Sequence, residues 1–224
     1  KKLLLPDGVF MLEFADLASI IKYKMFDTIC HEHLEYYSSN VIKNLTQKNG
    51  LRLFDIKQNQ INGGSKQYFI CHQKSNIKSN NKLITKILKQ ESKLNLDKVS
   101  TFKKFIRKIN VLKLNLNNIL RKINKKKQII HCYGASTKGN VLLQYFKIDN
   151  KKIHFAAERN KNKYGLVTPG TQIKIISEKL SRSLRPNYYL VMPWHFKKEI
   201  IKREKDTLKK GTKLIFPLPK LQIF

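Results

Sequence analysis

Residues 26–37, FDTICHEHLEYY, gather side chains that can transfer protons or bind a metal. Positions 31–37 alone hold two histidines, two glutamates and two tyrosines. A histidine beside a carboxylate suits acid–base work, because the carboxylate fixes the imidazole tautomer and stabilises the imidazolium. If residues 30–34 are extended, His31 and His33 lie on one side and Glu32 on the other. A zinc site, an acid–base centre and a structural loop all fit, but no third metal ligand is evident and the residues alone favour the loop.

A second chemical motif is YGASTKGN, residues 133–140, which follows an apolar run and opens a helical pattern. Gly134 and Gly139 allow a tight turn, and the free N–H groups of a helix start attract an anion. Ser136, Thr137 and Lys138 add two hydroxyls and a cation. The spacing matches neither GxGxxG nor a P-loop. Glu158 ends the next predicted strand, where an acid can hold ribose hydroxyls. Together these residues favour a nucleotide-type ligand over a simple strand-to-helix turn.

These motifs lie on elements that indicate an α/β chain of three parts. In residues 1–74, strands are predicted at 8–14, 51–58 and 66–73, and a helix runs from Ser39 to Asn49 before Gly50. Residues 75–127 are lysine-rich and helical, with one apolar stripe: Phe102, Phe105, Ile106, Ile109, Leu112, Leu116, Ile119, Leu120 and Ile123. Residues 128–224 alternate strands with helices, which predicts a doubly wound parallel sheet.

Composition narrows the class of partner. The chain has 46 Lys and Arg against 15 Asp and Glu, a net charge of +31, but the lysines are spread along the chain and accompany many Asn and Ile residues. We therefore expect biased coding composition rather than a nucleic-acid partner. No run approaches the roughly 18 apolar residues of a membrane span. Cys30, Cys71 and Cys132 show no metal-binding spacing, which favours a reducing cytoplasm and no metal in this chain.

Five segments, in order, carry a family resemblance: FDTICHEHLEYYS, GLRLFDIKQNQINGGS, YGASTKGNVLLQYF, AERNKNKYGLVTPGTQIKI and MPWHFKKEIIKRE. They closely resemble the nucleotide-sugar C-methyltransferases, which use S-adenosylmethionine to methylate a carbon of a keto-deoxysugar. That family has an N-terminal zinc-binding domain, a Rossmann-like methyltransferase domain and a C-terminal Rossmann-like domain. The resemblance implies that 1–74 is the C-terminal part of the methyltransferase domain, 75–127 a helical connector, and 128–224 the nucleotide-sugar-binding domain.

The resemblance also implies which strands of the methyltransferase sheet these residues form. The first strand resembles the fifth strand of the methyltransferase sheet, and 51–73 resembles its closing hairpin. The cysteines that bind zinc in the family and the glycine-rich loop that holds the methyl donor have no counterpart in these residues. The chain therefore looks like a fragment, or another chain supplies the rest.

The implied catalytic residues are His33, as the base that removes a proton beside a carbonyl, and Glu32, which orients or polarises it. One departure is Asn62, at a position where the family has a histidine before Gly-Gly-Ser, because an amide cannot take a proton. The implied substrate-binding residues are His31, Tyr36, Asn62, Gly63, Gly64, Ser65, Gly134, Ser136, Thr137, Lys138, Gly139, Asn140, Glu158, Arg159, Asn160, Trp194 and His195. Two alternatives stay open: methylation at oxygen or nitrogen, and a nucleotide-sugar-binding module without catalysis in this chain.

Overall fold

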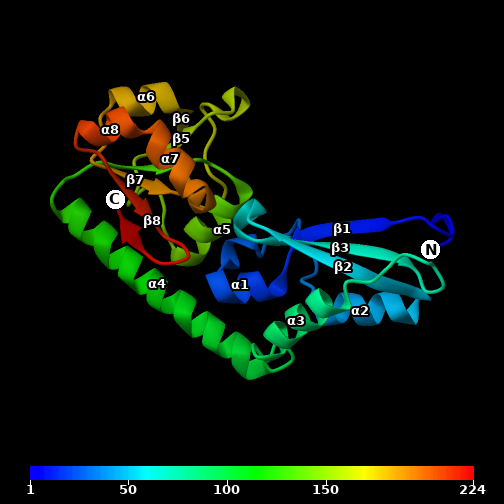
Figure 1. The fold of residues 1–224 in the computed structure, drawn as a ribbon. Coiled ribbons are helices and arrows are strands. Elements are labelled where there is room, and N and C mark those ends of the chain that lie inside the picture. The colour runs from blue at the N-terminus through cyan, green and yellow to red at the C-terminus, as the bar shows by residue number, and fades with distance from the viewer. The chain divides into compact units, whose positions relative to one another are not determined.

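The computed structural model describes residues 1–224, apart from the side chain of Asn62. The chain divides into two compact units, residues 1–24 with 34–106, and residues 25–33 with 107–224 (Figure 1). The short segment that precedes and includes the HEH motif thus belongs to the second unit. None of the helices described is long and apolar enough to cross a membrane.

The first unit is a three-stranded antiparallel sheet with helices. In chain order its elements are β1 (Phe10–Ala15), α1 (Leu17–Tyr23), α2 (Ser39–Lys48), β2 (Leu51–Asn59), the 3-10 turn η2 (Ile61–Gly63), β3 (Ser65–His72), α3 (Asn81–Ser92) and the start of α4 (Val99–Lys125). The strand order is β1-β3-β2. Apolar residues from the strands, α2 and α3 form its core: Ile42, Leu51, Leu53, Ile56, Tyr68, Ile70, Ile84 and Ile87.

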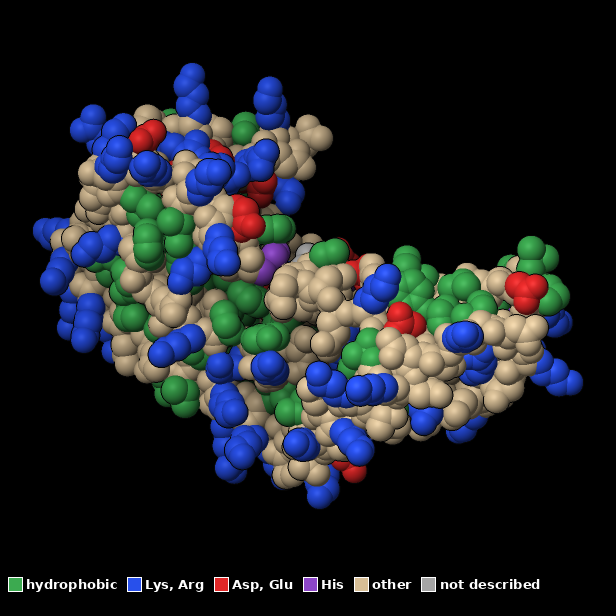
Figure 2. All heavy atoms as spheres, in the orientation of Figure 1, with side chains coloured by type: hydrophobic (Ala, Val, Ile, Leu, Met, Phe, Trp, Pro, Cys, Tyr) green, Lys and Arg blue, Asp and Glu red, His purple; other side chains and the backbone are tan. Residues whose placement is uncertain are grey.

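β1 lies at one edge of this sheet. β3 pairs with one side of β1, and none of the described strands pairs with the other. Phe10 and Met11 are exposed there, and Figure 2 shows apolar side chains over this region of the first unit.

A buried charge cluster lies behind the same sheet. Lys66 of β3 is 2% exposed and contacts two acids, Asp16 at the start of α1 and Glu91 of α3. The Lys66 Nζ atom lies 3.0 Å from the Asp16 carboxylate. The hydroxyl of Ser39 donates to Glu91 at 2.6 Å, and Ser39 N–H donates to the same carboxylate at 2.8 Å. The cluster therefore joins β3, α1, α2 and α3 through groups that have left water.

The second unit is the predicted doubly wound α/β fold. Its elements are η1 (Phe26–Thr28), the rest of α4, β4 (Ile130–Tyr133), α5 (Thr137–Phe146), β5 (Phe155–Glu158), η3 (Lys161–Lys163), β6 (Ile175–Ser177), α6 (Glu178–Ser183), β7 (Tyr188–Val191), η4 (Trp194–Phe196), α7 (Lys197–Arg203), α8 (Lys205–Lys209), β8 (Lys213–Phe216) and β9 (Gln222–Ile223). The strand order is β6-β5-β4-β7-β8-β9, and only the final pairing, β8 with β9, is antiparallel. Figure 1 shows α6, α7 and α8 on one face and α5 with α4 on the other.

This order confirms the Rossmann-like expectation and locates a ligand crevice. The chain winds from β4 to β5 and β6 on one side, then returns to β7 and β8 on the other. The loops after β4 and β7 consequently diverge in opposite directions. In such sheets, ligands bind at the carboxyl ends of the strands at this switch point.

One condition considered for the HEH segment is not met. Residues 30–34 are not extended, because the chain turns at Cys30 and the N–H of His33 donates to the Cys30 carbonyl at 3.0 Å. His31 and His33 are therefore not on a common strand face.

Candidate functional site

A cavity of about 400 Å³ occupies the switch point of the second unit. Its lining comes from the ends of β4, β5 and β7 and from α6 and α7: Tyr133, Gly134, Ser136, Ala157, Glu158, Arg159, Glu178, Pro193, Phe196, Glu199, Ile200 and Arg203. The predicted residues Gly134, Ser136, Glu158 and Arg159 are thus brought together in one cavity.

The loop after β4 is built around its glycines. Gly134 has φ +88°, and a Cβ atom there would lie 3.2 Å from the Pro193 ring, so a side chain would be both strained and crowded. Ser136 caps α5 by accepting the Gly139 N–H at 3.2 Å. A Cβ on Gly139 would lie 3.0 Å from Met192. Gly139 therefore permits α5 to pack closely on the end of β7.

Glu158 ties the loops after β4 and β5 together. Its carboxylate accepts the backbone N–H groups of Ala135, Arg159 and Asn160 at 2.8, 2.8 and 3.0 Å. Burial alone would raise the pKa of Glu158, but these donors and Lys163 outweigh it, and the pKa lies below its ordinary value of 4.5. The carboxylate holds the rim of the cavity in shape.

The lowered pKa of Glu158 predicts a pH effect. A depressed folded-state pKa stabilises the fold above the pKa of the unfolded chain, and this contribution is lost as the pH falls through the folded value. We expect Glu158→Gln to lower the unfolding free energy at pH 7 by about 1–2 kcal/mol, since charged hydrogen bonds are lost at a half-open site. Urea unfolding across pH should show the gap to wild type closing below pH 4.5. A constant gap would contradict this role.

The cavity also contains charged residues that the sequence motifs did not single out. Arg203 pairs with Glu178 at 3.0 Å and donates to the Tyr133 hydroxyl. The Tyr133 hydroxyl in turn donates to Glu204 at 2.8 Å. Arg159 has no ion pair within the described part of the chain, so its guanidinium is the cation available to an anionic ligand here. Tyr133 and Arg203 lie in segments quoted from the sequence, but their place in the cavity depends on how α7 covers the crevice.

A second group of predicted residues lies outside this cavity, against η1. Trp194 is 7% exposed, and its indole N–H donates to the buried Asp27 carboxylate at 2.8 Å. Burial raises the pKa of Asp27, opposed by the Trp194 hydrogen bond and the charge of Lys138. Burial, with Lys138, lowers the pKa of His195 to about 4, so its imidazole is neutral at pH 7. The loop 134–140 therefore borders the cavity with one part and the η1 segment with another.

The HEH residues themselves lie in an exposed turn. His31, Glu32 and His33 are exposed, and Cys30 is partly buried. Cys30, Glu32 and His33 each offer one ligand atom within 4.8 Å of the others. Glu32 is thus a neighbour of His33, and Cys30 is a third neighbour, where the sequence had shown no third ligand for a metal.

The remaining predicted residues occupy other places. Tyr36 lines a cavity of about 750 Å³ in the first unit, and Gly64 and Ser65 line one of about 450 Å³ there with Asp16 and Lys66. Thr137 and Lys138 begin α5, which also includes Asn140, and Asn160 accepts the Asn162 N–H to start η3. Gly63 ends η2, and the prediction for Asn62 concerns a side chain that lies outside the described part of the chain.

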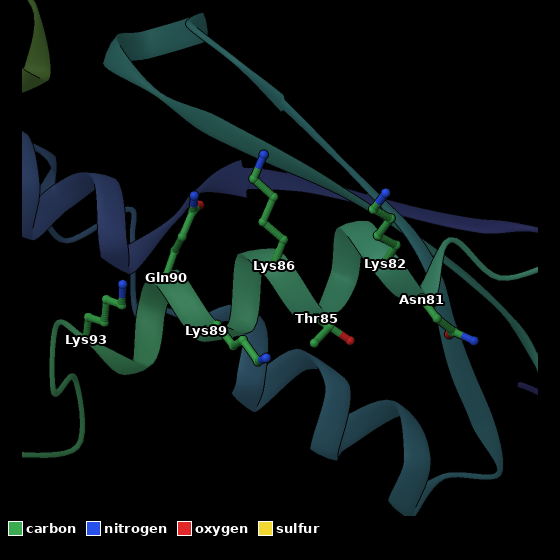
Figure 3. Close-up of a pocket in the computed structure, with 7 residues that line it drawn as sticks. All are labelled: Asn81, Lys82, Thr85, Lys86, Lys89, Gln90 and Lys93. Carbon is green, nitrogen blue, oxygen red and sulfur yellow. The ribbon is translucent and has the colours of Figure 1, made fainter.

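A further hollow of about 610 Å³ runs beside α3. All of its lining residues come from that helix: Asn81, Lys82, Thr85, Lys86, Lys89, Gln90 and Lys93. Figure 3 shows Lys86 and Lys89 pointing to opposite sides of α3 rather than toward a common point. This hollow is a basic helix surface. Figure 2 likewise shows Lys and Arg spread over both units instead of gathered in one patch.

The strand order, the glycine turn and the cavity at the switch point define a Rossmann-like ligand-binding unit. Residues 60–219 match the model of a family described as the C-methyltransferase C-terminal domain, and the chain belongs to this C-methyltransferase family. It is 29% identical over 221 residues to the C-methyltransferase NovU of Streptomyces niveus. The match covers 99% of this chain and 52% of NovU, so the chain spans about half the length of the known relative it matches. The family resemblance seen in the motifs is confirmed.

Proposed function

We propose that this chain takes part in transfer of a methyl group from S-adenosylmethionine to a carbon of a nucleoside-diphosphate keto-deoxysugar. The observation that carries the proposal is the cavity at the switch point, in a chain of the C-methyltransferase family. Helix α5 begins beside it, and Arg159 supplies a cation for a diphosphate. The apolar Pro193, Phe196 and Ile200 offer a surface for a base or sugar.

The chemistry that this chain would supply is proton transfer. C-methylation requires a carbanion equivalent, formed by removing the proton from the carbon beside the sugar carbonyl. In our proposal the imidazole of His33 takes that proton, the C–H electron pair passes into the enolate, and Glu32 orients the ring. S-adenosylmethionine would provide the electrophilic methyl group.

The donor and the zinc of the family have no assigned residues here. The first unit offers no glycine-rich strand-to-helix loop in its described residues, and its sheet has only three strands. Cys30, Cys71 and Cys132 are free and do not cluster with one another. The free thiols support our proposal of a cytoplasmic setting.

A proton-exchange experiment tests this function without the methyl donor. The chain is mixed in D₂O with TDP-, UDP- or GDP-linked 4-keto-6-deoxysugars, and NMR follows both ligand line broadening and loss of the signal of the hydrogen beside the carbonyl. Broadening with one nucleotide and exchange catalysed by the chain would support the enzyme. Neither effect with any ligand would contradict it.

A binding module without catalysis is the second candidate. It is favoured by the concentration of the cavity residues in the second unit, where Tyr133, Gly134 and Arg203 lie together. Line broadening without exchange would identify this function. Methylation at oxygen or nitrogen would instead be seen from the position of a ¹³C-labelled methyl group in the product of the protein that contains the donor site.

A further inference from the structure

The chain changes abruptly from buried to exposed where it enters the HEH turn. Met25, Phe26, Asp27 and Thr28 have exposed fractions of 0, 5, 1 and 1%. The residues that follow from 31 to 33 are exposed. Residues 25–28 therefore act as an anchor, a name kept below for this segment, and the HEH turn is its exposed continuation.

Apolar contacts hold one side of the anchor on the second unit. The Phe26 ring stacks on Phe146 of α5, with centroids 5.0 Å apart and planes 21° apart. It also meets the Tyr145 ring at 5.4 Å. These contacts bury the Phe26 ring against α5.

The polar side of the anchor is hydrogen-bonded to the residue that follows the end of β7. Trp194 follows the end of β7, next to the Pro193 ring that borders the cavity, and donates its indole N–H to Asp27 at 2.8 Å. An indole is rigid, carries one donor and is oriented by only two torsions. Both partners are buried, so breaking this hydrogen bond would leave a buried polar group unpaired, which costs free energy.

The length of chain between the anchor and the base limits where the base can go. Six peptide units separate Asp27 from His33, and even a fully extended chain would span only about 20 Å. The turn at Cys30 shortens that reach further. Fixing Asp27 beside the end of β7 therefore restricts His33 to the neighbourhood of the switch-point loops of its own unit.

We infer that Trp194 and Asp27 are positioning residues, which hold the segment that carries His33 on the unit that contains the nucleotide-sugar cavity. The inference rests on the proposed function of His33. It gives Trp194 a role through its N–H group rather than through stacking on the substrate. It also gives Asp27, which the sequence motifs did not single out, a part in the reaction.

The test compares Trp194→Phe and Asp27→Ala, which remove the bond, with Asp27→Asn, which keeps a carbonyl acceptor for the indole. The matched control is Tyr189→Phe, which removes another buried aromatic hydrogen bond on β7, the 2.8 Å contact with Ser181. Amide hydrogen exchange of residues 29–34 is measured for each variant, together with the substrate proton exchange described above.

We expect Trp194→Phe and Asp27→Ala to speed amide exchange in 29–34 about tenfold or more, while peptides from β4 and β7 change little. The rate constant for substrate proton exchange should fall about 10²-fold, with the KM for the nucleotide sugar within about twofold of wild type. Asp27→Asn should restore both properties. Since Trp194 is the only tryptophan of the chain, its fluorescence should shift in Asp27→Ala and not in Tyr189→Phe.

Two outcomes would overturn the inference. One is that Trp194→Phe and Asp27→Ala lose amide protection equally throughout the second unit. That result is expected for a bond that only stabilises the fold, and it is expected for Tyr189→Phe. The other is faster amide exchange of residues 29–34 in Trp194→Phe and Asp27→Ala with no change in substrate proton exchange, although His33→Gln is inactive. If His33→Gln itself exchanges the substrate proton normally, the proposed function fails and the positioning role fails with it, whereas the amide data still report the anchor independently.

Discussion

His33→Gln is expected to slow exchange of the substrate proton beside the carbonyl by about 10²- to 10⁴-fold, the usual contribution of a positioned general base. Glutamine keeps a hydrogen-bonding side chain of similar size at this exposed turn but cannot take the proton. The measurement is the NMR exchange rate at saturating nucleotide sugar, so that binding and proton transfer are separated. Line broadening of the ligand should be unchanged.

Chemical rescue provides the control for this prediction. Because His33 is exposed, added imidazole can reach the space left in His33→Ala. We expect imidazole to restore part of the exchange in His33→Ala and none in His33→Gln, where the side chain fills the space. A His33→Ala protein that exchanges at the wild-type rate without imidazole would remove His33 from the mechanism.

Lys66→Met should destabilise the first unit by about 3–5 kcal/mol, the range observed when one partner of a buried ion pair is removed. Methionine retains the length of the chain but leaves the buried carboxylates of Asp16 and Glu91 without their cation. The loss would be measured by urea unfolding followed by circular dichroism, together with amide exchange of β3. Tryptophan fluorescence is unsuitable, because Trp194 belongs to the second unit.

Two variants make the Lys66 result specific. Lys93→Met changes an exposed lysine that lines the same cavity of the first unit and should alter the unfolding free energy by less than about 0.5 kcal/mol. Adding Glu91→Gln to Lys66→Met removes one of the uncompensated charges and should recover part of the loss. Equal effects of Lys66→Met and Lys93→Met would show that the buried cluster contributes no more than a surface lysine.

The regular elements could be predicted because their patterns are local. Alternating residues placed β2 and β3, and the Gly50 signal ended α2 within a residue or two of its observed end at Lys48. The three-residue β6 and two-residue β9 were missed because so few residues give no periodicity. The strand order of the second unit followed the doubly wound expectation.

The contacts that define the candidate site are not local and could not be predicted in the same way. Trp194 and Asp27 are 167 residues apart, and neither residue type indicates the other. Lys66 occurs in a chain with lysines throughout, so nothing in the sequence marked it as the buried one. Whether residues 30–34 are extended was left open by the sequence, and the backbone hydrogen bond from the His33 N–H to the Cys30 carbonyl closes a turn there.

The unpaired outer edge of β1 has a consequence for handling the protein. Its backbone N–H and C=O groups form a row with no partner strand among the described residues, and Phe10 and Met11 add apolar side chains to it. Such an edge is a template on which a second copy can pair, strand against strand. In concentrated solution this chain should therefore be prone to edge-to-edge association, and like-charge repulsion from a net charge of +31 should oppose it most strongly at low ionic strength.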